Sequence, residues 1–576
     1  MFQPVLDPLG GSLGWSALVA ALPLIVFFVL LGVVRLSAPR SGLAALATAV
    51  VVAIAAYDMP AGQALNSAAE GAVFGLFPIM WIVVNALWIY QMTVDTGHFE
   101  VLRRSFSRLS DDQRLQAVIV AFCFGALLEA LAGFGAPVAI SSVMLIALGF
   151  RPFKAATVAL VANTAPVAFG AMGTPVITLA HLTGVPLDDI SSTVGRQTPV
   201  LACIVPLLLV FLVDGRRGLK ETWLPALACG LAFAFTQFAC SNYISVEMTD
   251  VVAALAAVGV LVLVMRLTGV GATGGAGARP TLPPVIAGGS EDADPALVER
   301  LRKRAEASEP SGSRSGASDA SEASDVPEGR GATARAYLPY AVIIAVFAIA
   351  QLDAVKEALA HGSVAFAWPG LDVADPVTGD PVAATTFTFN WLPATGTLLL
   401  LSGVVTAAAL AVRPAVAVRA YGRTLHQLRW AILTVATVLA LAYVMNLSGQ
   451  TSTIGHWIAG AGSGLAFLSP VLGWLGVAVS GSDTSANALF GTLQVTAARS
   501  SGLSPELLAS ANSSGGVLGK MLSPQNLAIA AAATGLGGRE PELLRKVVGW
   551  SLLLLLVMCV LVYLQSTAVL SWMLPV

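Results

Sequence analysis

The chain has 576 residues, of which 56% are hydrophobic and 11% are charged, and its mean hydropathy is +0.80. Soluble domains carry roughly 25% charged residues, so this composition excludes an ordinary soluble protein and predicts an all-α polytopic membrane protein. The formal net charge of -2 gives no reason to expect a nucleic-acid partner. The five cysteines lack metal-ligand spacing, and we expect neither a metal site nor another cofactor.

Apolar runs near the roughly 20 residues needed to cross a bilayer predict about twelve transmembrane helices. The first run lacks both a preceding basic region and a cleavage site, so we expect it to remain in the mature protein. The predicted spans are residues 17–34, 42–57, 72–93, 155–180, 197–213, 223–241, 249–267, 336–352, 392–412, 430–448, 507–535 and 547–567.

Two further apolar segments, residues 113–150 and 464–498, have interrupted middles. The first contains Gly133 and Gly135 followed by a proline, and the second is interrupted near Asp483. Glycine and proline at this density do not form an uninterrupted helix. Such a break at membrane depth is tolerated where it is buried in protein or lines a cavity. We interpret both segments as re-entrant hairpins.

The basic residues gather in alternate connections, which indicates a fixed orientation. By the positive-inside rule these connections are cytoplasmic and both termini lie outside. The remaining connections, including the loop with Glu247 and Asp250, are poor in Lys and Arg. This alternation holds if the two hairpins enter from opposite sides of the membrane. The basic connections contain Arg35 and Arg40; Arg103, Arg104, Arg108 and Arg114; Arg151 and Lys154; Arg216, Arg217 and Lys220; Arg413, Arg419, Arg423 and Arg429; and Arg539, Arg545 and Lys546.

Residues 269–334 differ from the rest of the chain, because they are rich in Gly, Ala, Ser, Pro, Glu and Asp. They contain too little apolar surface to offset the entropy of ordering them. We predict a disordered cytoplasmic linker between a first membrane half, residues 1–268, and a second half, residues 335–576. The acidic loop at 353–390 is expected to be external, as a connector or a lid.

The two halves contain a weak internal repeat. A shift of 349 positions, which is 512 minus 163, aligns Asn163–Pro175 with Asn512–Pro524, and Asn, Gly, Met and Pro coincide. The same shift aligns Gly133–Pro137 with Ser482–Ala486. We therefore predict interrupted helices at about 155–180 and 507–535, each following a hairpin. Paired interrupted segments at equivalent positions of two halves indicate the binding site of an inverted-repeat transporter.

The same segments carry a family resemblance. They read Leu128-Glu129 with Ala132-Gly-Phe-Gly-Ala-Pro-Val-Ala-Ile140, Gly481-Ser-Asp-Thr-Ser485 with Asn487-Ala-Leu-Phe-Gly491, and Ala511-Asn512 with Gly515-Gly-Val517, Gly519-Lys-Met521 and Ser523-Pro-Gln525. This sequence resembles the lactate permease family in both halves. The resemblance implies import of L-lactate, D-lactate and glycolate with protons. It also implies two inverted repeats, each with a re-entrant hairpin and a broken helix.

Three charged residues lie within the interrupted segments. Lys520 would cost about 2.5–3.5 kcal/mol at the bilayer centre unless it is paired or hydrated. It could bind the substrate carboxylate, pair with Asp483, or do each alternately; the alternative is a static Lys520–Asp483 salt bridge. Burial and a nearby lysine shift the proton affinity of a carboxyl group in opposite directions. Glu129 and Asp483 are therefore the predicted proton-coupling acids, although Glu129 could instead be a protonated structural group.

We expect the substrate to bind between the hairpin tips and the broken helices. Helix N-termini that face this space would favour an anion. Each polar side chain there could instead satisfy interrupted backbone. The predicted substrate-binding residues are Gly133, Phe134, Gly135, Asn163, Thr164, Thr174, Ser482, Thr484, Ser485, Asn487, Asn512, Ser513, Ser514, Lys520 and Ser523.

The sequence thus predicts a proton symporter for 2-hydroxymonocarboxylates that works by alternating access in the inner cell membrane. A sodium-coupled carboxylate carrier stays open, because Asn, Ser and Thr at interrupted backbone also suit Na+. An anion channel stays open too. We expect no enzyme activity, because no spacing of Ser, Asp and Lys makes a convincing nucleophile and base. A homodimer is possible by analogy with other carriers.

Overall fold

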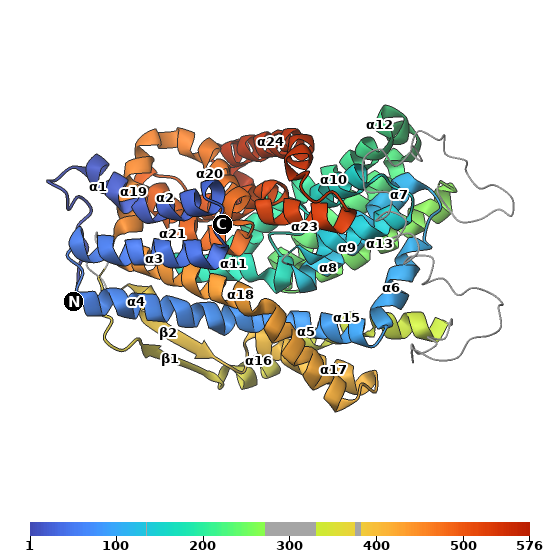
Figure 1. Ribbon diagram of the computed structural model, residues 1–576, viewed down its shortest axis with the longest axis horizontal. Coiled ribbons are helices and arrows are strands. Elements are labelled where there is room, and N and C mark those ends of the chain that lie inside the picture. Colours follow the sequence, from blue (N-terminus) through green and yellow to red (C-terminus); the bar gives the residue numbers. More distant parts are fainter. Residues whose placement is uncertain (134, 271–329, 375–381, 576) are drawn as a thin grey trace.

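The computed structural model describes residues 1–133, 135–270, 330–374 and 382–575, and it is an elongated assembly of helices (Figure 1). Among these residues, ten helices are long and apolar enough to cross a membrane. Three shorter apolar helices accompany them: Ala136–Ala147, Pro152–Ala162 and Thr395–Ala409. The chain is therefore a multi-pass membrane protein. The predicted linker lies mainly at 271–329, outside the described residues.

The helices of the first half follow the predicted apolar runs closely. The runs at 197–213 and 223–241 are joined in one helix, and the run at 155–180 is divided. The bounds are α1 (Leu13–Ala20), α2 (Leu22–Phe28), α3 (Ala38–Ala55), α4 (Ala61–Phe74), α5 (Trp81–Asp95), α6 (His98–Ser107), α7 (Gln113–Ala117), α8 (Gly125–Ala132), α9 (Ala136–Ala147), α10 (Pro152–Ala162), α11 (Gly170–Thr183), α12 (Leu187–Tyr243) and α13 (Thr249–Thr268), with short π-helical turns η1 (Val29–Val33), η2 (Gly75–Met80) and η3 (Val118–Phe124).

Helix α12 is a pair of antiparallel arms rather than one straight rod. At 57 residues a straight helix would be about 86 Å long, which far exceeds the bilayer. Its backbone leaves the helical region at Asp214 and Gly215. The two arms pack side by side: the Ser191 hydroxyl of the first donates to the Ser241 carbonyl of the second at 2.9 Å. The two apolar runs predicted in this region therefore form two separate helical arms.

The second half opens with a helix that starts at Arg330, within the segment predicted as linker. Its bounds are α15 (Arg330–Ala350), α16 (Asp353–Ala360), α17 (Thr395–Ala409), α18 (Pro414–Leu447), α19 (Gln450–Ile458), α20 (Leu465–Ser480), α21 (Asp483–Ser501), α22 (Pro505–Gly519), α23 (Pro524–Thr534) and α24 (Glu540–Gln565), with 3-10 turns η5 (Ala383–Thr385), η6 (Ala459–Gly464), η7 (Lys520–Leu522) and η8 (Ser571–Met573).

Both segments predicted to be interrupted contain a helix, a break and a second helix. In the first half, α8 ends before Gly133 and α9 starts after Gly135, and these glycines have φ values of 36° and 85°. In the second half, Gly481, with φ of 76°, and Ser482 separate α20 from α21. A positive φ is readily adopted by glycine. The breaks predicted at Gly133 and Gly135 and near Asp483 are therefore present in the structure.

The two predicted broken helices are interrupted at different points. Helix α10 ends beside Asn163, whereas the aligned Asn512 lies inside α22, which continues to Gly519. Pro166 follows α10, and the position 349 residues later holds Gly515, so α22 has no proline there. A proline disfavours helix in the residue before it. The broken helix predicted at 507–535 is therefore interrupted at η7, just before Pro524.

The interrupted segments of the two halves interlock. Helix α9 packs on α23, and α21 packs on α11, so each segment predicted to be a hairpin contacts the broken helix of the other half. The Asn487 amide on α21 donates to the Pro175 carbonyl of α11 at 3.2 Å. These helices gather in the middle of the molecule (Figure 1). All four interruptions therefore lie in one interior region.

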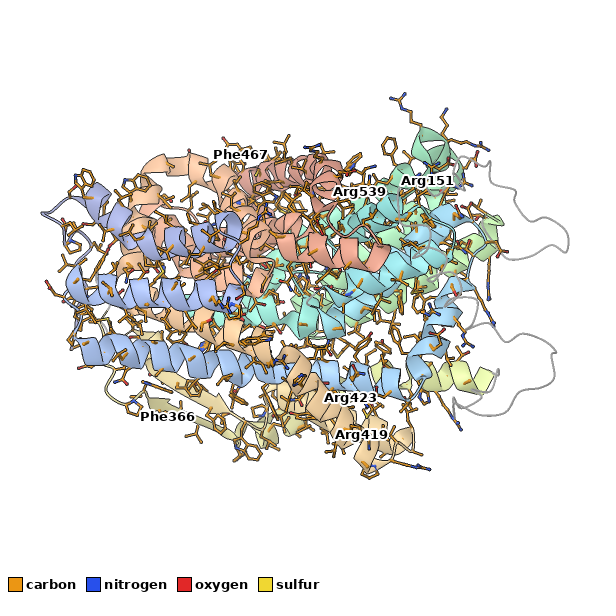
Figure 2. All side chains as sticks on the ribbon, viewed as in Figure 1. Arg151, Phe366, Arg419, Arg423, Phe467 and Arg539 are labelled. Carbon is orange, nitrogen blue, oxygen red and sulfur yellow. The ribbon has the colours of Figure 1, made fainter. Side chains whose placement is uncertain are left out.

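The loop predicted to be external contains a two-stranded sheet and contacts the N-terminus. Strands β1 (Ser363–Ala367) and β2 (Thr386–Asn390) are antiparallel, with Ser363 opposite Asn390. The Phe2 amide donates to the Asp372 carbonyl at 2.8 Å, so the N-terminus and this loop lie at the same end. The labelled residues Arg151, Arg419, Arg423 and Arg539 lie toward the other end, away from Phe366 (Figure 2).

Candidate functional site

A buried ion pair joins the two halves at the centre of the interlocked region. Lys520, the first residue of η7, donates from Nζ to Oε1 of Glu129 on α8. Only 6% of Lys520 and 2% of Glu129 is exposed. The static Lys520–Asp483 salt bridge considered from the sequence is not formed. Lys520 instead has a partner in the other half of the chain, which the sequence analysis did not propose.

Two glycines make room for the Glu129 side chain, because they carry no Cβ atom. A Cβ at Gly170, the first residue of α11, would lie 3.1 Å from both Cγ and Oε1 of Glu129. A Cβ at Gly133 would lie 3.8 Å from the same oxygen. The second carboxylate oxygen, Oε2, is buried and has no hydrogen-bond partner among the described residues. Glu129 therefore uses one oxygen for Lys520 and keeps the other free.

Asp483 occupies a separate position at the start of α21. Its Oδ2 atom accepts a hydrogen bond from the Ser513 hydroxyl at 2.7 Å. Its Oδ1 atom is buried and has no hydrogen-bond partner among the described residues. A Cβ at Gly516 would lie only 2.3 Å from this oxygen, so α22 passes directly beside it. Asp483 still interacts electrostatically with Lys520, although the two are not hydrogen-bonded.

A chain of hydrogen-bonded amide side chains begins at Asp483 and runs between α21 and α22. The Asn487 amide approaches Asp483 Oδ2 at 3.5 Å, and the Asn512 amide donates to Asn487 Oδ1 at 2.9 Å. Gln494 then donates to Asn512 Oδ1 at 3.3 Å. All four side chains are buried. Gln494 was not a sequence candidate; its position two helical turns after Asn487, on the same face of α21, is the signal that could have found it.

Two further predicted residues present unpaired polar atoms. Both side-chain atoms of the Asn163 amide are buried without a hydrogen-bond partner among the described residues, and so is the Ser514 hydroxyl. Most buried polar atoms in proteins are hydrogen-bonded, so each exception needs an explanation. Together with Glu129 Oε2 and Asp483 Oδ1, these atoms are candidates to meet a polar ligand.

Other predicted residues bond to interrupted backbone. Thr164 donates to the Val161 carbonyl at 2.8 Å, and Thr174 donates to the Ala171 carbonyl. Two other predicted residues cap helices: Ser482 accepts from the Ser485 amide and Ser523 accepts from the Asn526 amide, both at 3.2 Å. Such side-chain caps stabilise a helix start by about 0.5–2 kcal/mol.

The remaining predicted residues are two glycines at the first break, Thr484 and Phe134. Gly133 and Gly135 form the first break, and a Cβ at Gly135 would meet Ile529 of α23 at 2.4 Å. Thr484 stands in the first turn of α21 and is half-buried. Phe134 lies outside the described residues. The structure thus gathers the glycines, the ion pair and the amide chain around the same interlocked helices.

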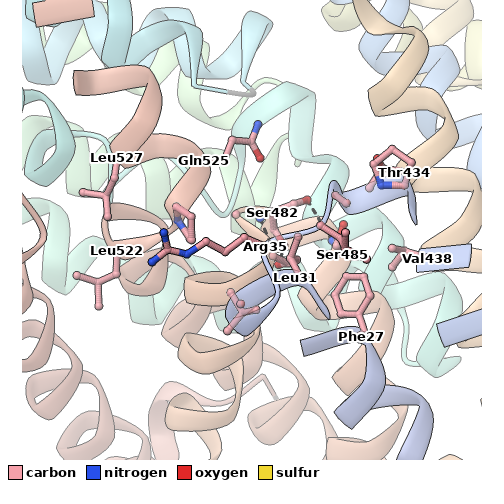
Figure 3. Close-up of a pocket in the computed structure, with 18 of the residues that line it drawn as sticks. Phe27, Leu31, Arg35, Thr434, Val438, Ser482, Ser485, Leu522, Gln525 and Leu527 are labelled. Carbon is pink, nitrogen blue, oxygen red and sulfur yellow. Dashed lines mark hydrogen bonds between the residues drawn. The ribbon is translucent and has the colours of Figure 1, made fainter. Parts of the chain in front are cut away.

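A cavity of about 880 Å³ reaches this region from one side (Figure 3). Its lining includes Ser482 and Ser485 of α21, Gln525 of α23 and Arg35. Arg35 is exposed and has no hydrogen-bond or ion-pair partner in the described part of the chain. Glu129 and Lys520 are not among the lining residues, whereas Leu522 is. The cavity therefore ends close to the ion pair without opening onto it.

Sequence reasoning also misplaced one acid. Asp250 was assigned to a connection between spans, but it lies in the first turn of α13 and is fully buried. Its Oδ1 atom accepts a hydrogen bond from the Gln237 amide at 3.1 Å. The signal available in the sequence was its place directly before an apolar run, where an acid favours a helix N-terminus. The structure therefore adds a third buried acid near the site.

Comparison with known proteins identifies relatives of this chain. Residues 16–273 and 300–569 match the family described as L-lactate permease. The L-lactate permease of Bacillus subtilis is 40% identical, with 99% of each chain covered, and glycolate permease GlcA of Escherichia coli is 40% identical, with 97% of each covered. The L-lactate permease of Escherichia coli is 38% identical over the whole of both chains.

Among solved structures, the Alcanivorax borkumensis YdaH transporter is 13% identical, with a TM-score of 0.44 and coverage of 96% of this chain and 97% of that chain. The family match spans most of both membrane halves, and the relatives named above align along nearly their full lengths. The chain belongs to the L-lactate permease family.

Proposed function

We propose that this protein is a secondary active transporter that imports L-lactate, D-lactate and glycolate with protons by alternating access. The relatives are named L-lactate permeases and a glycolate permease, which supports small 2-hydroxymonocarboxylates as substrates. The observation that carries the proposal is the buried ion pair between Glu129 and Lys520. It combines an anion-binding group with a proton-binding group at the contact between the two halves.

The ion pair explains how substrate and proton could be coupled. A lactate carboxylate can replace Glu129 as the partner of Lys520, since both present the same group to the ammonium. The displaced Glu129 carboxylate would then be buried without a cation, which costs several kcal/mol. Protonation removes this cost, so binding of the anion favours uptake of a proton at Glu129. One charge at Lys520 is thus always balanced by one carboxylate.

The unpaired polar atoms nearby supply a binding site for the rest of the substrate. We assign the 2-hydroxyl group to Asp483 Oδ1 as acceptor, with Asn163 and Ser514 as further hydrogen-bonding groups. All of these atoms are buried and lack a hydrogen-bond partner among the described residues. A site whose polar groups remain unpaired without the substrate hydroxyl discriminates strongly against analogues that lack this hydroxyl. Asp483 is also our second candidate for a proton-coupling acid.

The proposed architecture consists of two inverted repeats, residues 1–268 and 335–576, joined by a cytoplasmic linker at 269–334. Twelve crossings and two oppositely oriented re-entrant hairpins, at 113–150 and 464–498, make up the transporter. The protein lies in the inner cell membrane with both termini on the outside, and it forms a homodimer. The alternation of basic connections supports this orientation. The cavity at Arg35 is then the cytoplasmic path to the site.

Uptake of labelled L-lactate into liposomes tests the proposal. Purified protein is reconstituted, and an inward proton gradient is imposed in one set and an inward sodium gradient in another. Accumulation above equilibrium with the proton gradient alone supports the proposed symport. Accumulation with sodium alone would favour a sodium-coupled carrier, and equilibration without accumulation under either gradient would favour a channel.

A further inference from the structure

Asp250 is buried beside the arm that carries Glu129. Its helix, α13, packs against α8 and also against η3 and α11. None of the Asp250 side chain is exposed. Its carboxyl group and that of Glu129 are close enough to interact electrostatically. A third buried acid therefore lies on a helix that packs directly against the helix of Glu129.

One oxygen of Asp250 is held and the other is free. Gln237 of α12 donates from Nε2 to Asp250 Oδ1 at 3.1 Å, and its Oε1 accepts from the Thr198 hydroxyl at 3.2 Å. This second hydrogen bond orients the Gln237 amide, so that its NH2 group faces the acid. Asp250 Oδ2 is buried without a hydrogen-bond partner in the described part of the chain. Glu129 Oε2 is in the same condition.

No described cation is paired with Asp250. Among the described residues, the titratable groups that interact electrostatically with it are Glu129 of α8 and the Cys240 thiol of α12. Neither supplies a positive charge at neutral pH. An ionised carboxylate buried without a partner costs several kcal/mol, whereas a protonated carboxyl group needs only hydrogen bonds. The surroundings of Asp250 therefore suit an acid that holds a proton.

We propose that Asp250 is a second proton-binding group, which receives the proton from the outside and passes it to Glu129. This relay rests on the proposed proton symport. The two oxygens are not hydrogen-bonded to each other, so the proton crosses between them through water: the O–H bond at Asp250 Oδ2 breaks and an O–H bond at Glu129 Oε2 forms. Asp250 is left as a carboxylate and takes up a new proton from the outside. Neutral Glu129 then releases Lys520 to the substrate carboxylate.

The place of Asp250 along the chain fits a path from the outside. It lies three residues after Glu247, which is half-buried and belongs to a connection that the charge pattern assigns to the external side. Glu247 is itself held by hydrogen bonds from Ser245 and from Thr395, the latter at 3.0 Å. Glu247 is therefore a matched control: an acid at the same helix end that is already satisfied.

The test compares Asp250→Asn with Glu247→Gln in liposomes, using two assays on each variant. Lactate exchange, with lactate on both sides, needs a folded site but no net movement of protons. Accumulation driven by a proton gradient needs the whole proton path. The relay predicts that Asp250→Asn keeps exchange and loses accumulation, while Glu247→Gln keeps both. Normal accumulation by Asp250→Asn would overturn the relay, and so would loss of accumulation by both variants.

The wild-type protein separates failure of the relay from failure of the proposed symport. A wild type that exchanges lactate but shows no proton-driven accumulation would overturn both, whereas a wild type that accumulates lactate leaves only the relay in question. If Asp250→Asn also loses exchange, its substrate site is no longer intact, and the relay is tested with Asp250→Glu instead. This variant keeps a carboxyl group but moves it, so the relay predicts that accumulation persists with a shifted dependence on external pH. An unshifted pH profile would overturn the relay.

Discussion

Lys520 and Glu129 form a buried ion pair although they are 391 positions apart in the sequence. Each half of the chain contributes one of the two charges, and each charge lies at or next to a helix break. A pair of this kind is stable only while both partners are present or both are neutral. The predictions below follow from that condition.

Replacing Glu129 with Gln removes the proton-binding group but keeps a similar shape. We expect proton-driven accumulation of lactate to be lost, while exchange of lactate across the membrane persists. Both are measured in liposomes with labelled L-lactate. Glu506→Gln is the control, because Glu506 is an acid in the first turn of α22 that is hydrogen-bonded to Ser504. Normal accumulation by Glu129→Gln would contradict the role of Glu129.

Replacing Lys520 with Met should abolish both accumulation and exchange, because the partner of the substrate carboxylate is lost. It should also destabilise the protein by about 3–5 kcal/mol, since Glu129 is left as an unpaired buried charge. The double variant Glu129→Gln with Lys520→Met should recover most of this stability and none of the transport. Thermal unfolding in detergent measures the stability. Additive losses in the double variant would show that the pair is not coupled.

Asp483→Asn should weaken proton-driven uptake and raise the KM for lactate, because the atom assigned to the 2-hydroxyl group changes from an acceptor to an amide. Ser513→Ala removes the hydrogen bond to Asp483 Oδ2. It should affect uptake less than Asp483→Asn does, and it should destabilise the protein by about 1.5–3 kcal/mol. Uptake kinetics for lactate and for propionate, which lacks the hydroxyl group, separate the two roles. Equal loss for both substrates would exclude recognition of the hydroxyl group by Asp483.

Glycines beside the site should tolerate no side chain. A Cβ at Gly519 would lie 2.2 Å from the Trp474 carbonyl oxygen, which is backbone and cannot rotate away. Gly519→Ala should therefore lower the unfolding temperature and abolish transport. Gly549→Ala in α24 is the control, because a Cβ there meets nothing within 4 Å. It should be neutral or slightly stabilising, by up to about 1 kcal/mol. A stable, active Gly519→Ala variant would be inconsistent with this packing.

Arg35 should speed the movement of anions between the cavity and the cytoplasm. Arg35→Gln is expected to reduce lactate efflux at low ionic strength and to make efflux less sensitive to salt, since salt screens the attraction of an exposed charge. Arg40→Gln is the matched control, because Arg40 is an exposed arginine nearby that does not line the cavity. Efflux that responds equally to both substitutions would assign no special role to Arg35.

Most of the helix bounds could be predicted because span length and hydrophobicity depend on local sequence. The breaks at Gly133 and near Asp483 could be predicted for the same reason, since glycine and proline act on their own backbone. The repeat was less informative in detail: Asn163 and Asn512 align, yet Pro166 ends one helix where Gly515 lets the other continue.

The partners within the site could not be predicted from the sequence. Lys520 had two acids available in the motifs. The choice of Glu129 over Asp483 depends on tertiary packing that brings η7 of one half within hydrogen-bond reach of α8 of the other, and no local pattern reports this. Asp250 was missed because a single acid at the edge of an apolar run looks like part of a polar loop. Its burial becomes visible only when α13 is placed against α8.

The most direct test of the account is the proton uptake that accompanies lactate binding. L-lactate is added to purified wild-type protein in detergent and weak buffer at neutral pH, and the pH change is followed. The account predicts that the solution becomes more alkaline, because Glu129 takes up a proton when lactate displaces it from Lys520, and that Glu129→Gln shows no such change. Lactate binding without proton uptake by the wild type, or with equal uptake by Glu129→Gln, would contradict it.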